Sequence, residues 1–525
     1  MNINNLTGYN FQRENLAGKS INNGVESRIV KNQYTKVLTQ FKLTTVLFLC
    51  LTVLFADSCK KFIQVPAPTT SLSSNNVYTT DQTAIAVLNG IYIQMSQYSG
   101  LSGYFNPLST SAVCGLSADE LEFIPAGGNE TYALYFTNQL NPQASNGGSF
   151  YDNIYPLIYS VNSAIAGLNT STVLTPAVKQ QLIGEAEFIR AYLNFYLVNL
   201  YGDVPLALTT DYKTNATLPR SPQQQVYQQI ITDLLNSKKS LSSNFLDVTL
   251  LASSPDRLRP TKWAADALLA RVYLYYGNLT NESDNYKNAT AESDTIINNT
   301  TLFGLSDPNN VFLQASLGNN EPIWQIEPVQ PGYPVNDALL FVLPTTGPNS
   351  SNNPVWLNSD LVKAFEPGDL RKKDWIDSVN VDGTVYYYPY KFKNNVLNST
   401  INEYYDIFRL GEIYLIRAEA EANNNLLAAS VGDLNAIRTR AGIPNYSGVM
   451  DQTSILQAIM RERRIEFFSE MGHRWLDLKR TGTVNSVMSL ATPKKGGTWN
   501  ANWALYPIPL DDIQYDPNLK QNPGY

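Results

Sequence analysis

YDIFRLGEIYLIRAEAEANNN (residues 405–425) opens the stretch that decides the fold, and GDLNAIRTRAGI (432–443) and IMRERRIEFFSEMGHRWLDLKR (459–480) complete it. The first piece repeats at steps of three and four, the spacing of one helix face: Leu410, Ile413, Tyr414, Arg417, Ala420 and Glu421. Ala418 and Ala422 lie four residues apart, so a second helix can approach closely at these small side chains. The second piece predicts that helix, which a glycine and a proline end. The third piece predicts another helix that runs through the two phenylalanines of its FF pair.

Earlier parts of the chain repeat this pattern of paired helices. Three long segments carry an Ala-Arg or Arg-Ala step among apolar residues: IRAYLNFYLVNLYG (189–202), LLARVYLYYG (268–277) and LIRAEAEANN (415–424). We predict about four helix pairs, near 81–168, 178–241, 261–298 and 405–441. Repeated pairs with small residues at contact points indicate a mainly α fold with tetratricopeptide-like stacking. Asp81 is expected to cap the first helix, and residues 103–148 show no helical period.

A region of different character lies between the last two helix pairs, at residues 302–404. EPIWQIEP (321–328) predicts a buried strand that contains Trp324 as a core residue. VYYYPYKFK (385–393) predicts an edge strand, because its proline has no N–H to donate to a sheet. We interpret the region as a loop-rich insertion with short strands, placed where binding surfaces usually lie.

The N-terminal part has the pattern of an export signal. Residues 43–55 are apolar except for three threonines, which is too short for a membrane span and typical of a signal peptide. ADSC follows and predicts lipid attachment at Cys59, although a plain secretory signal is the alternative. We therefore divide the chain into a lipoprotein signal peptide (1–58), a lipidated tether (59–76) and a single body (77–525). Cys114 then remains without a partner and is expected to be buried.

Composition narrows the classes of partner. Removing residues 1–58 takes away six basic and three acidic side chains, so the net charge changes from −7 to −10. No long basic run remains, which argues against nucleic acid and anionic lipid as partners. Charged residues make up 16% of the chain, and 32 tyrosines are present. A neutral, polar and aromatic surface suits uncharged hydroxylated ligands, although a solvated extracellular surface explains most of it equally well.

Catalytic and metal motifs are scarce. His473 is the one histidine of the chain, and no GxSxG elbow accompanies it, so we interpret it as structural. Metal sites of the His/Cys kind are excluded by count; oxygen-ligated Ca²⁺ stays open, and we expect no metal and no cofactor. Arg190, Arg271 and Arg417 lie among apolar residues, and we interpret them as packing ion pairs rather than as an anion site.

Four ordered elements resemble the C-terminal signature of the RagB/SusD family of Bacteroidetes outer-membrane lipoproteins: RLGEIYLIRAEA (409–420), LNAIRTRAGI (434–443), RERRIEFFSEMGHRWLDLKR (461–480) and YPIPLDDIQYDPNLKQNPGY (506–525). The resemblance implies a tetratricopeptide-like fold and a lipid-anchored protein on the outer face of the outer membrane. It also implies a protein that is not an enzyme, which captures a glycan or oligosaccharide and delivers it to a SusC-like TonB-dependent transporter.

Aromatic residues in loops are the candidates for ligand binding, because sugars present apolar faces to rings and hydroxyls to neighbouring amides. The candidate residues are Tyr104, Phe105, Asn106, Tyr333 and Trp356. Two alternatives stay open: the same role with a peptide as the ligand, and a surface glycoside hydrolase whose carboxylates the sequence alone does not identify.

Overall fold

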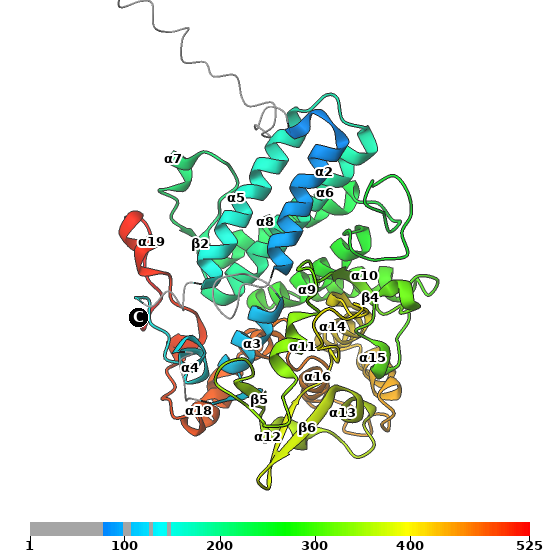
Figure 1. Ribbon diagram of the computed structural model, residues 1–525, viewed down its shortest axis with the longest axis vertical. Helices are drawn as coiled ribbons and strands as arrows, with labels where there is room; N and C mark the ends of the chain where they lie inside the picture. Colours follow the sequence, from blue (N-terminus) through cyan, green and yellow to red (C-terminus); the bar gives the residue numbers. More distant parts are fainter. Residues whose placement is uncertain (1–76, 98–106, 125–129, 144–148) are drawn as a thin grey trace, which may run out of the picture. The chain divides into compact units, whose positions relative to one another are not determined.

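The regular elements follow the apolar spacing of the sequence. The computed structural model describes residues 77–97, 107–124, 130–143 and 149–525, in which helices dominate and strands are short (Figure 1). These residues fall within one compact unit, Ser74–Tyr525. The predicted fold class, mainly α with tetratricopeptide-like helix pairs, is confirmed. The predictions for the signal peptide, Cys59 and the tether lie outside the described residues.

Long helices form the scaffold: α2 (Asp81–Ser96), α5 (Ser149–Thr170), α6 (Pro176–Tyr201), α8 (Gln223–Ser240), α9 (Lys262–Thr280), α10 (Ser283–Ile297), α14 (Leu410–Asn423), α15 (Leu427–Arg440) and α16 (Gln452–Glu466). From α5 to α10, each of these helices packs on the next one along the chain. Helix α14 then packs on α10, α15 and α16, and α2 lies against both α5 and α6 (Figure 1). The apolar faces are thereby buried in a continuous series of helix contacts.

Buried ion pairs join neighbouring helices of this scaffold. Each predicted arginine meets a carboxylate of another helix: Arg190 with Asp233 at 2.8 Å, Arg271 with Glu412 at 2.6 Å, and Arg417 with Asp433 at 2.7 Å. The paired groups connect α6 with α8, α9 with α14, and α14 with α15. Their interpretation as packing pairs is therefore confirmed.

Two helix glycines differ in their surroundings and allow a matched test of packing. A Cβ on Gly277 would stand 2.7 Å from Cε1 of Tyr286 on α10, whereas a Cβ on Gly90 meets nothing within 4 Å. We expect Gly277→Ala to lower the free energy of unfolding by about 1–3 kcal/mol, because the tyrosine ring must move. Gly90→Ala should raise it by up to about 1 kcal/mol through helix propensity. Urea unfolding measures both, and equal effects would contradict close packing at Gly277.

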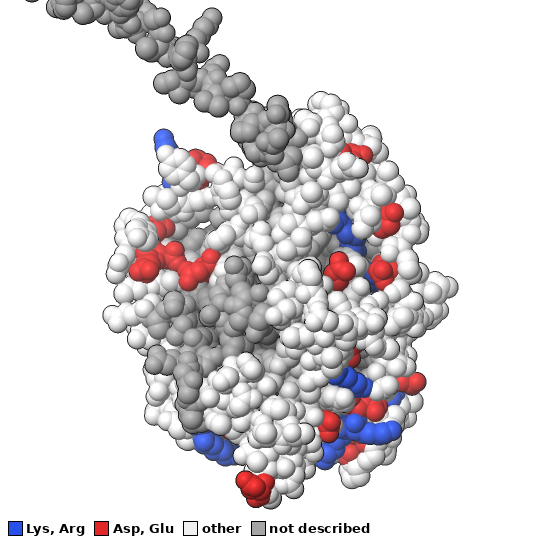
Figure 2. Space-filling model, in the orientation of Figure 1, with Lys and Arg blue, Asp and Glu red and all other residues white. Residues whose placement is uncertain are grey.

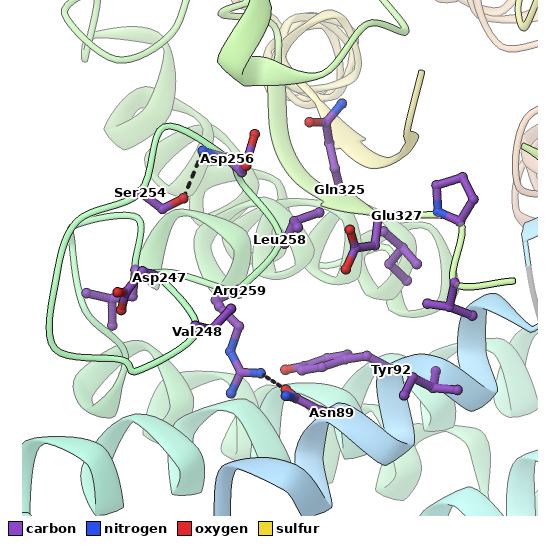
Figure 3. A pocket seen from close by; sticks show the side chains of 15 residues that line it. Asn89, Tyr92, Asp247, Val248, Ser254, Asp256, Leu258, Arg259, Gln325 and Glu327 are labelled. Atoms are coloured by element: carbon purple, nitrogen blue, oxygen red, sulfur yellow. Dashed lines mark hydrogen bonds between the residues drawn. The ribbon is translucent and has the colours of Figure 1, made fainter. Parts of the chain in front are cut away.

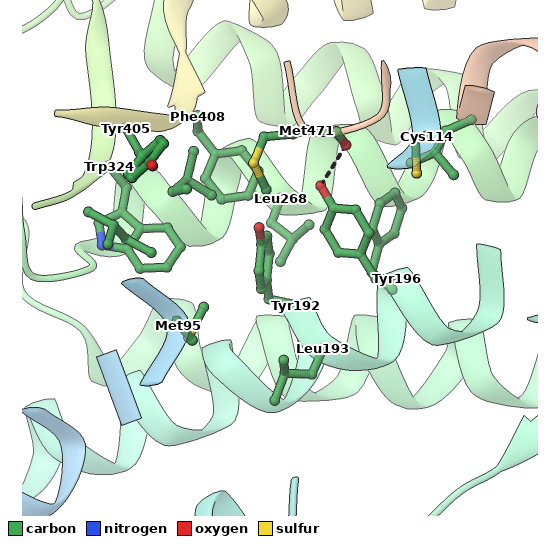
Figure 4. Close-up of a cluster of buried hydrophobic side chains, with 14 of the residues drawn as sticks. Met95, Cys114, Tyr192, Leu193, Tyr196, Leu268, Trp324, Tyr405, Phe408 and Met471 are labelled. Carbon is green, nitrogen blue, oxygen red and sulfur yellow. Dashed lines mark hydrogen bonds between the residues drawn. The ribbon is translucent and has the colours of Figure 1, made fainter. Parts of the chain in front are cut away.

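Aromatic side chains join the helices to the strands. Strand β4 (Pro322–Ile326) pairs antiparallel with β8 (Tyr405–Arg409), and the fully buried Trp324 stacks on Phe408 with ring centroids 6.2 Å apart. Its indole N–H donates to the carbonyl of Leu258 at 3.0 Å. Figure 4 shows Trp324, Tyr192, Tyr196 and Cys114 in this region, where the Tyr196 hydroxyl donates to the Met471 carbonyl at 3.1 Å. Trp324 and Cys114 are buried as predicted.

The sequence missed two helices in the region 103–148. The structure has α3 (Pro107–Ser117), β1 (Leu121–Phe123) and α4 (Glu130–Phe136) there. Helix α3 reads PLSTSAVCGLS, and its residues 110–117 are all buried. Because these residues have no solvent-facing side, their sequence shows no alternation of apolar and polar side chains.

The expected cap at Asp81 was also wrong. Thr80 caps α2 by accepting from the Thr83 N–H, and Asp81 accepts from the Thr175 N–H at 2.9 Å.

The insertion is rich in loops, as predicted, and contains short helices in addition to short strands. Its elements are η2 (Pro308–Asn310), η3 (Ala315–Leu317), β4, α11 (Asn336–Phe341), β5 (Val355–Leu357), α12 (Ser359–Ala364), α13 (Leu370–Trp375), β6 (Ile376–Val381) and β7 (Thr384–Pro389). Strand β5 pairs with β1, and β6 pairs with β7. Both predicted strands exist, as β4 and β7.

Smaller elements outside the insertion complete the fold: η1 (Val77–Thr79), β2 (Val204–Pro205), α7 (Tyr212–Asn215), β3 (Arg220–Ser221), α17 (His473–Arg480), α18 (Val484–Lys494), η4 (Ala501–Ala504) and α19 (Leu510–Tyr515).

The C-terminal block is organised around a buried charge network. Arg409 donates to Glu466 at 2.5 Å and to Glu470 at 2.9 Å, and all three side chains are nearly inaccessible to solvent. Burial alone would raise the pKa of Glu466, but Arg440, Arg409 and Arg371 hold it well below its usual value. Glu466 is therefore a carboxylate that three guanidinium groups share.

The third predicted helix ends earlier than expected. It was predicted to continue through Phe467 and Phe468, but α16 ends at Glu466. Ser469 and Met471 adopt φ values of 54° and 45°, which a helix does not accommodate. The turn places His473 in the core, with its ring 4.7 Å from that of Phe467. A buried ring in this position agrees with a structural role.

Candidate functional site

A cleft of about 510 Å³ opens between α2, the segment that joins α8 to α9, and the end of β4 (Figure 3). We call it the α2–β4 cleft. Its lining residues come from three separated parts of the chain: Asn89, Tyr92, Ile93, Leu246, Asp247, Val248, Ser254, Asp256, Leu258, Arg259, Gln325, Ile326, Glu327, Pro328 and Val329. Its volume lies in the range of pockets that bind small ligands, roughly 300–1,000 Å³.

Helix α2 supplies an aromatic wall that is held in place by hydrogen bonds. Asn89 and Tyr92 are three residues apart and lie on one face of the helix. The Tyr92 hydroxyl donates to Oε2 of Glu185 at 2.8 Å, and the Arg259 guanidinium lies over the Tyr92 ring at 5.2 Å. Arg259 also donates to Glu185 and to Asn89. Burial and the Glu185 carboxylate raise the pKa of Tyr92, so the ring stays neutral and fixed.

The segment before α9 forms a second, apolar wall. An antiparallel bridge between Leu246 and Ser253 closes a tight loop, in which Asp247 accepts from the Thr249 N–H at 3.0 Å. This loop presents Val248 toward the cleft with 78% of its surface exposed. An exposed aliphatic side chain at a cleft edge provides contact area for an apolar face of a ligand.

Two carboxylates, Asp256 and Glu327, provide acceptors on the side of the gap opposite Tyr92 and Arg259 (Figure 3). One oxygen of Asp256 is buried without a hydrogen-bond partner among the described residues. Burial, and then the charge of Asp256, raises the pKa of Glu327. Burial and these two carboxylates also raise the pKa of Tyr404 to about 12, so Tyr404 lies close to them.

The arrangement suits a ligand with hydroxyl groups on an apolar ring. Tyr92 and Val248 offer surfaces for C–H groups, and Asp256, Glu327 and Asn89 offer hydrogen-bonding groups. None of the described residues that line the cleft is a histidine or a cysteine. Across the described part of the chain, no cluster of three or more His, Cys, Asp or Glu side chains could hold a metal ion. In the same part, every helix is either too short or too polar to span a bilayer.

The predicted ligand-binding residues lie elsewhere. Tyr104, Phe105 and Asn106 are outside the described residues. Tyr333 is half-buried in a loop, where its N–H donates to the Gln330 carbonyl at 3.0 Å. Trp356 is in β5, with its ring perpendicular to that of Tyr386 at 5.4 Å. Neither Tyr333 nor Trp356 lines the α2–β4 cleft.

Sequence reasoning missed the cleft because its walls meet only in the folded chain. Arg259 and Asn89, which touch each other, are 170 positions apart. One signal was present: Tyr92 follows the buried Ile91 in α2, and Asn89 precedes Tyr92 by three residues on the same face of the helix. That pattern does not distinguish a ligand-facing ring from one that packs against a neighbour.

Comparison with known proteins places the chain in a family. A sequence model described as "SusD family" matches residues 370–525, and one described as "Starch-binding associating with outer membrane" matches residues 71–274. The chain belongs to the SusD/RagB family. The two matched segments include α2 and the segment before α9, whereas the β4 side of the cleft lies between them.

Individual members of the SusD/RagB family support this assignment. "SusD-like protein P2" of Formosa agariphila is 28% identical over 432 residues, which cover 72% of this chain and 80% of that protein. A SusD superfamily protein from Bacteroides vulgatus superimposes with a TM-score of 0.70 at 20% identity, covering 85% of this chain and 99% of the other. A laminarin-binding SusD-like protein superimposes with a TM-score of 0.67 at 22% identity, covering 84% and 99%. These structures share the fold.

Proposed function

We propose that this protein is a non-catalytic glycan-binding lipoprotein of the outer membrane. It binds an oligosaccharide in the α2–β4 cleft and delivers it to a SusC-like TonB-dependent transporter. Lipid attachment at Cys59 would hold it on the outer face of the membrane. The aromatic loop residues Tyr333 and Trp356, together with 104–106, remain candidates for additional ligand contacts.

One observation carries the proposal: the cleft combines a pre-positioned aromatic ring with acceptors on the opposite wall. Tyr92 is fixed by Glu185 and Arg259, so little conformational entropy is lost when a ligand packs on it. The acceptors Asp256 and Glu327 can receive hydrogen bonds from sugar hydroxyls. The family description, which mentions starch binding and the outer membrane, and the relative named for laminarin binding both agree with a glycan as the ligand.

The two carboxylates also support an alternative. A raised pKa is a property of general acids in glycoside hydrolases, and Glu327 has a raised pKa beside a second carboxylate. A surface glycoside hydrolase would release reducing ends from a polysaccharide, and binding alone would not. A peptide ligand is a further alternative, because the same acceptors bind backbone N–H groups.

Titration calorimetry with laminari-, malto- and xylo-oligosaccharides tests the proposal. We expect Glu327→Gln to weaken binding of the recognised sugar by about 10-fold or more, because the acceptor of the hydrogen bond loses its charge. Val248→Asp should weaken it as well, since it places a charge on the apolar wall. The exposed Glu282→Gln, outside the cleft, is the matched control and should bind like the unmodified chain.

Three results would contradict parts of this proposal. If both cleft variants bind the sugar with unchanged affinity, the ligand does not bind in the α2–β4 cleft. Cleavage of a labelled polysaccharide that Glu327→Gln abolishes would establish the hydrolase instead. Extraction in a gentle detergent that yields the protein without a TonB-dependent transporter would overturn the proposed partner.

A further inference from the structure

A second pocket, also of about 510 Å³, lies between α5, α7 and α19 and shares no residue with the α2–β4 cleft. Five tyrosines line it: Tyr151, Tyr155, Tyr159, Tyr212 and Tyr515. We call it the tyrosine pocket. The first three recur every four residues along α5, so they form one stripe on that helix.

The inner rings are packed and the outer rings are free to contact a ligand. Tyr151 and Tyr155 lie with ring centroids 4.6 Å apart, and the Tyr155 hydroxyl donates to the Pro205 carbonyl at 2.9 Å. Tyr159, Tyr212 and Tyr515 expose 53%, 72% and 86% of their surface. Three exposed aromatic rings from three separate elements around one pocket exceed what packing requires.

The charge of the tyrosine pocket is negative. Asp152, Asp512 and Asp516 line it, and none of its described lining residues is a lysine or arginine. Figure 2 shows acidic side chains gathered over α19. Burial together with Asp512 and Asp511 raises the pKa of Asp152 to about 6, so Asp152 and Asp512 lie close to each other. The two carboxylates therefore face each other without a cation between them.

Asn215 lines the pocket and has an amide oxygen without a partner among the described residues. Asn215, at the end of α7, donates through Nδ2 to the Thr209 carbonyl at 2.8 Å. Its Oδ1 atom is buried and has no hydrogen-bond partner among the described residues. Leaving a buried acceptor unpaired costs about 1–3 kcal/mol. The pocket thus offers aromatic faces and carboxylates. Its described lining residues carry no positive charge, and the nearby Lys213 ammonium lies 6.0 Å from the centre of the Tyr212 ring.

We propose that the tyrosine pocket is a second saccharide site that takes an amino sugar with a free ammonium group. The ammonium would lie between Asp152 and Asp512, and the C–H face of the sugar ring would lie on the exposed tyrosines. A cation satisfies both carboxylates and is also attracted to aromatic faces, whereas a neutral sugar leaves the carboxylates to repel each other. The inference rests on the proposed function only in taking a saccharide as the ligand.

Calorimetry on the full chain with three β-1,4-linked tetramers tests this site: glucosamine, N-acetylglucosamine and glucose. We expect the glucosamine tetramer to bind at least 10-fold more tightly than the other two. The double variant Asp152→Asn with Asp512→Asn should lose at least 10-fold in this affinity, and Tyr159→Ala should lose several-fold. Asp152 and Tyr159 are exposed and Asp512 is half-buried, and circular dichroism checks that each variant is folded. Glu282→Gln is again the matched control.

Several results would overturn the inference. Equal affinity for the three tetramers would show that the ammonium group does not contribute to binding. Unchanged affinity in the double variant would show that the ligand binds outside the tyrosine pocket. Binding of tetralysine without binding of the glucosamine tetramer would make the pocket a peptide site. If the neutral oligosaccharides bind in a Glu327-dependent way while the glucosamine tetramer does not bind, the second site alone is refuted and the proposed function stands.

Discussion

Replacing Arg409 by methionine is expected to lower the free energy of unfolding by about 3–5 kcal/mol, because it removes one of the buried cations that several buried carboxylates share. Arg409 donates to Glu466, Glu470 and Glu321 and also to the Glu466 carbonyl at 3.0 Å. These carboxylates have little contact with water, since their side chains are at most 8% exposed. Urea unfolding followed by circular dichroism measures the loss.

An exposed ion pair provides the control for Arg409. Lys287 lies 2.8 Å from Asp284, with side chains that are 64% and 82% exposed. Lys287→Met should change stability by less than about 0.5 kcal/mol, because solvent screens the pair. Similar losses in the two variants would show that the network around Arg409 contributes no more than a surface contact does.

Replacing Glu120 by glutamine is expected to stabilise the protein strongly at alkaline pH and not at acid pH. Burial, and then the charge of Asp119, raises the pKa of Glu120 from 4.5 to about 8. Between these values the folded state keeps a proton that the unfolded state releases, so stability falls as the pH rises. Glutamine does not ionise, so the variant does not lose stability in this way as the pH rises. The variant should therefore gain about 3–5 kcal/mol relative to the unmodified chain at pH 9 and nothing near pH 4.

The difference in unfolding free energy between the two proteins, measured from pH 4 to pH 9, tests this prediction. One Glu120 oxygen is buried without a partner and the other accepts from the Ser469 N–H at 3.4 Å, so glutamine fits in the same space. The exposed Glu282→Gln should follow the profile of the unmodified chain. A constant difference at all pH values would show that Glu120 is ionised in the folded protein.

Much of the scaffold could be predicted because apolar residues repeat at helical spacing. The helix pair expected near 178–241 is found as α6 (Pro176–Tyr201) and α8 (Gln223–Ser240). The strands β4 and β7 were found from their β-branched and aromatic runs. Helix α3 was missed because a helix that is buried on every side has no polar face, and periodicity then carries no information.

The binding surfaces could not be predicted in the same way. The sequence pointed to rings in loops, such as Tyr333 and Trp356, because loops often carry function. The α2–β4 cleft instead takes its ring from a helix and its acceptors from a loop and a strand end. The tyrosine pocket likewise combines α5 with α19, which are far apart in the sequence.

By itself, the sequence determined the helix pairs, the family signature and the buried arginines, because each of these depends on residues close together in the chain. Only the tertiary structure decided which side chains share a cleft. Asn89, Arg259 and Glu327 come from three distant segments, and their meeting depends on how the helices pack. Local spacing encodes which face of a helix is apolar, but the neighbours of its polar face are set by contacts between distant parts of the chain.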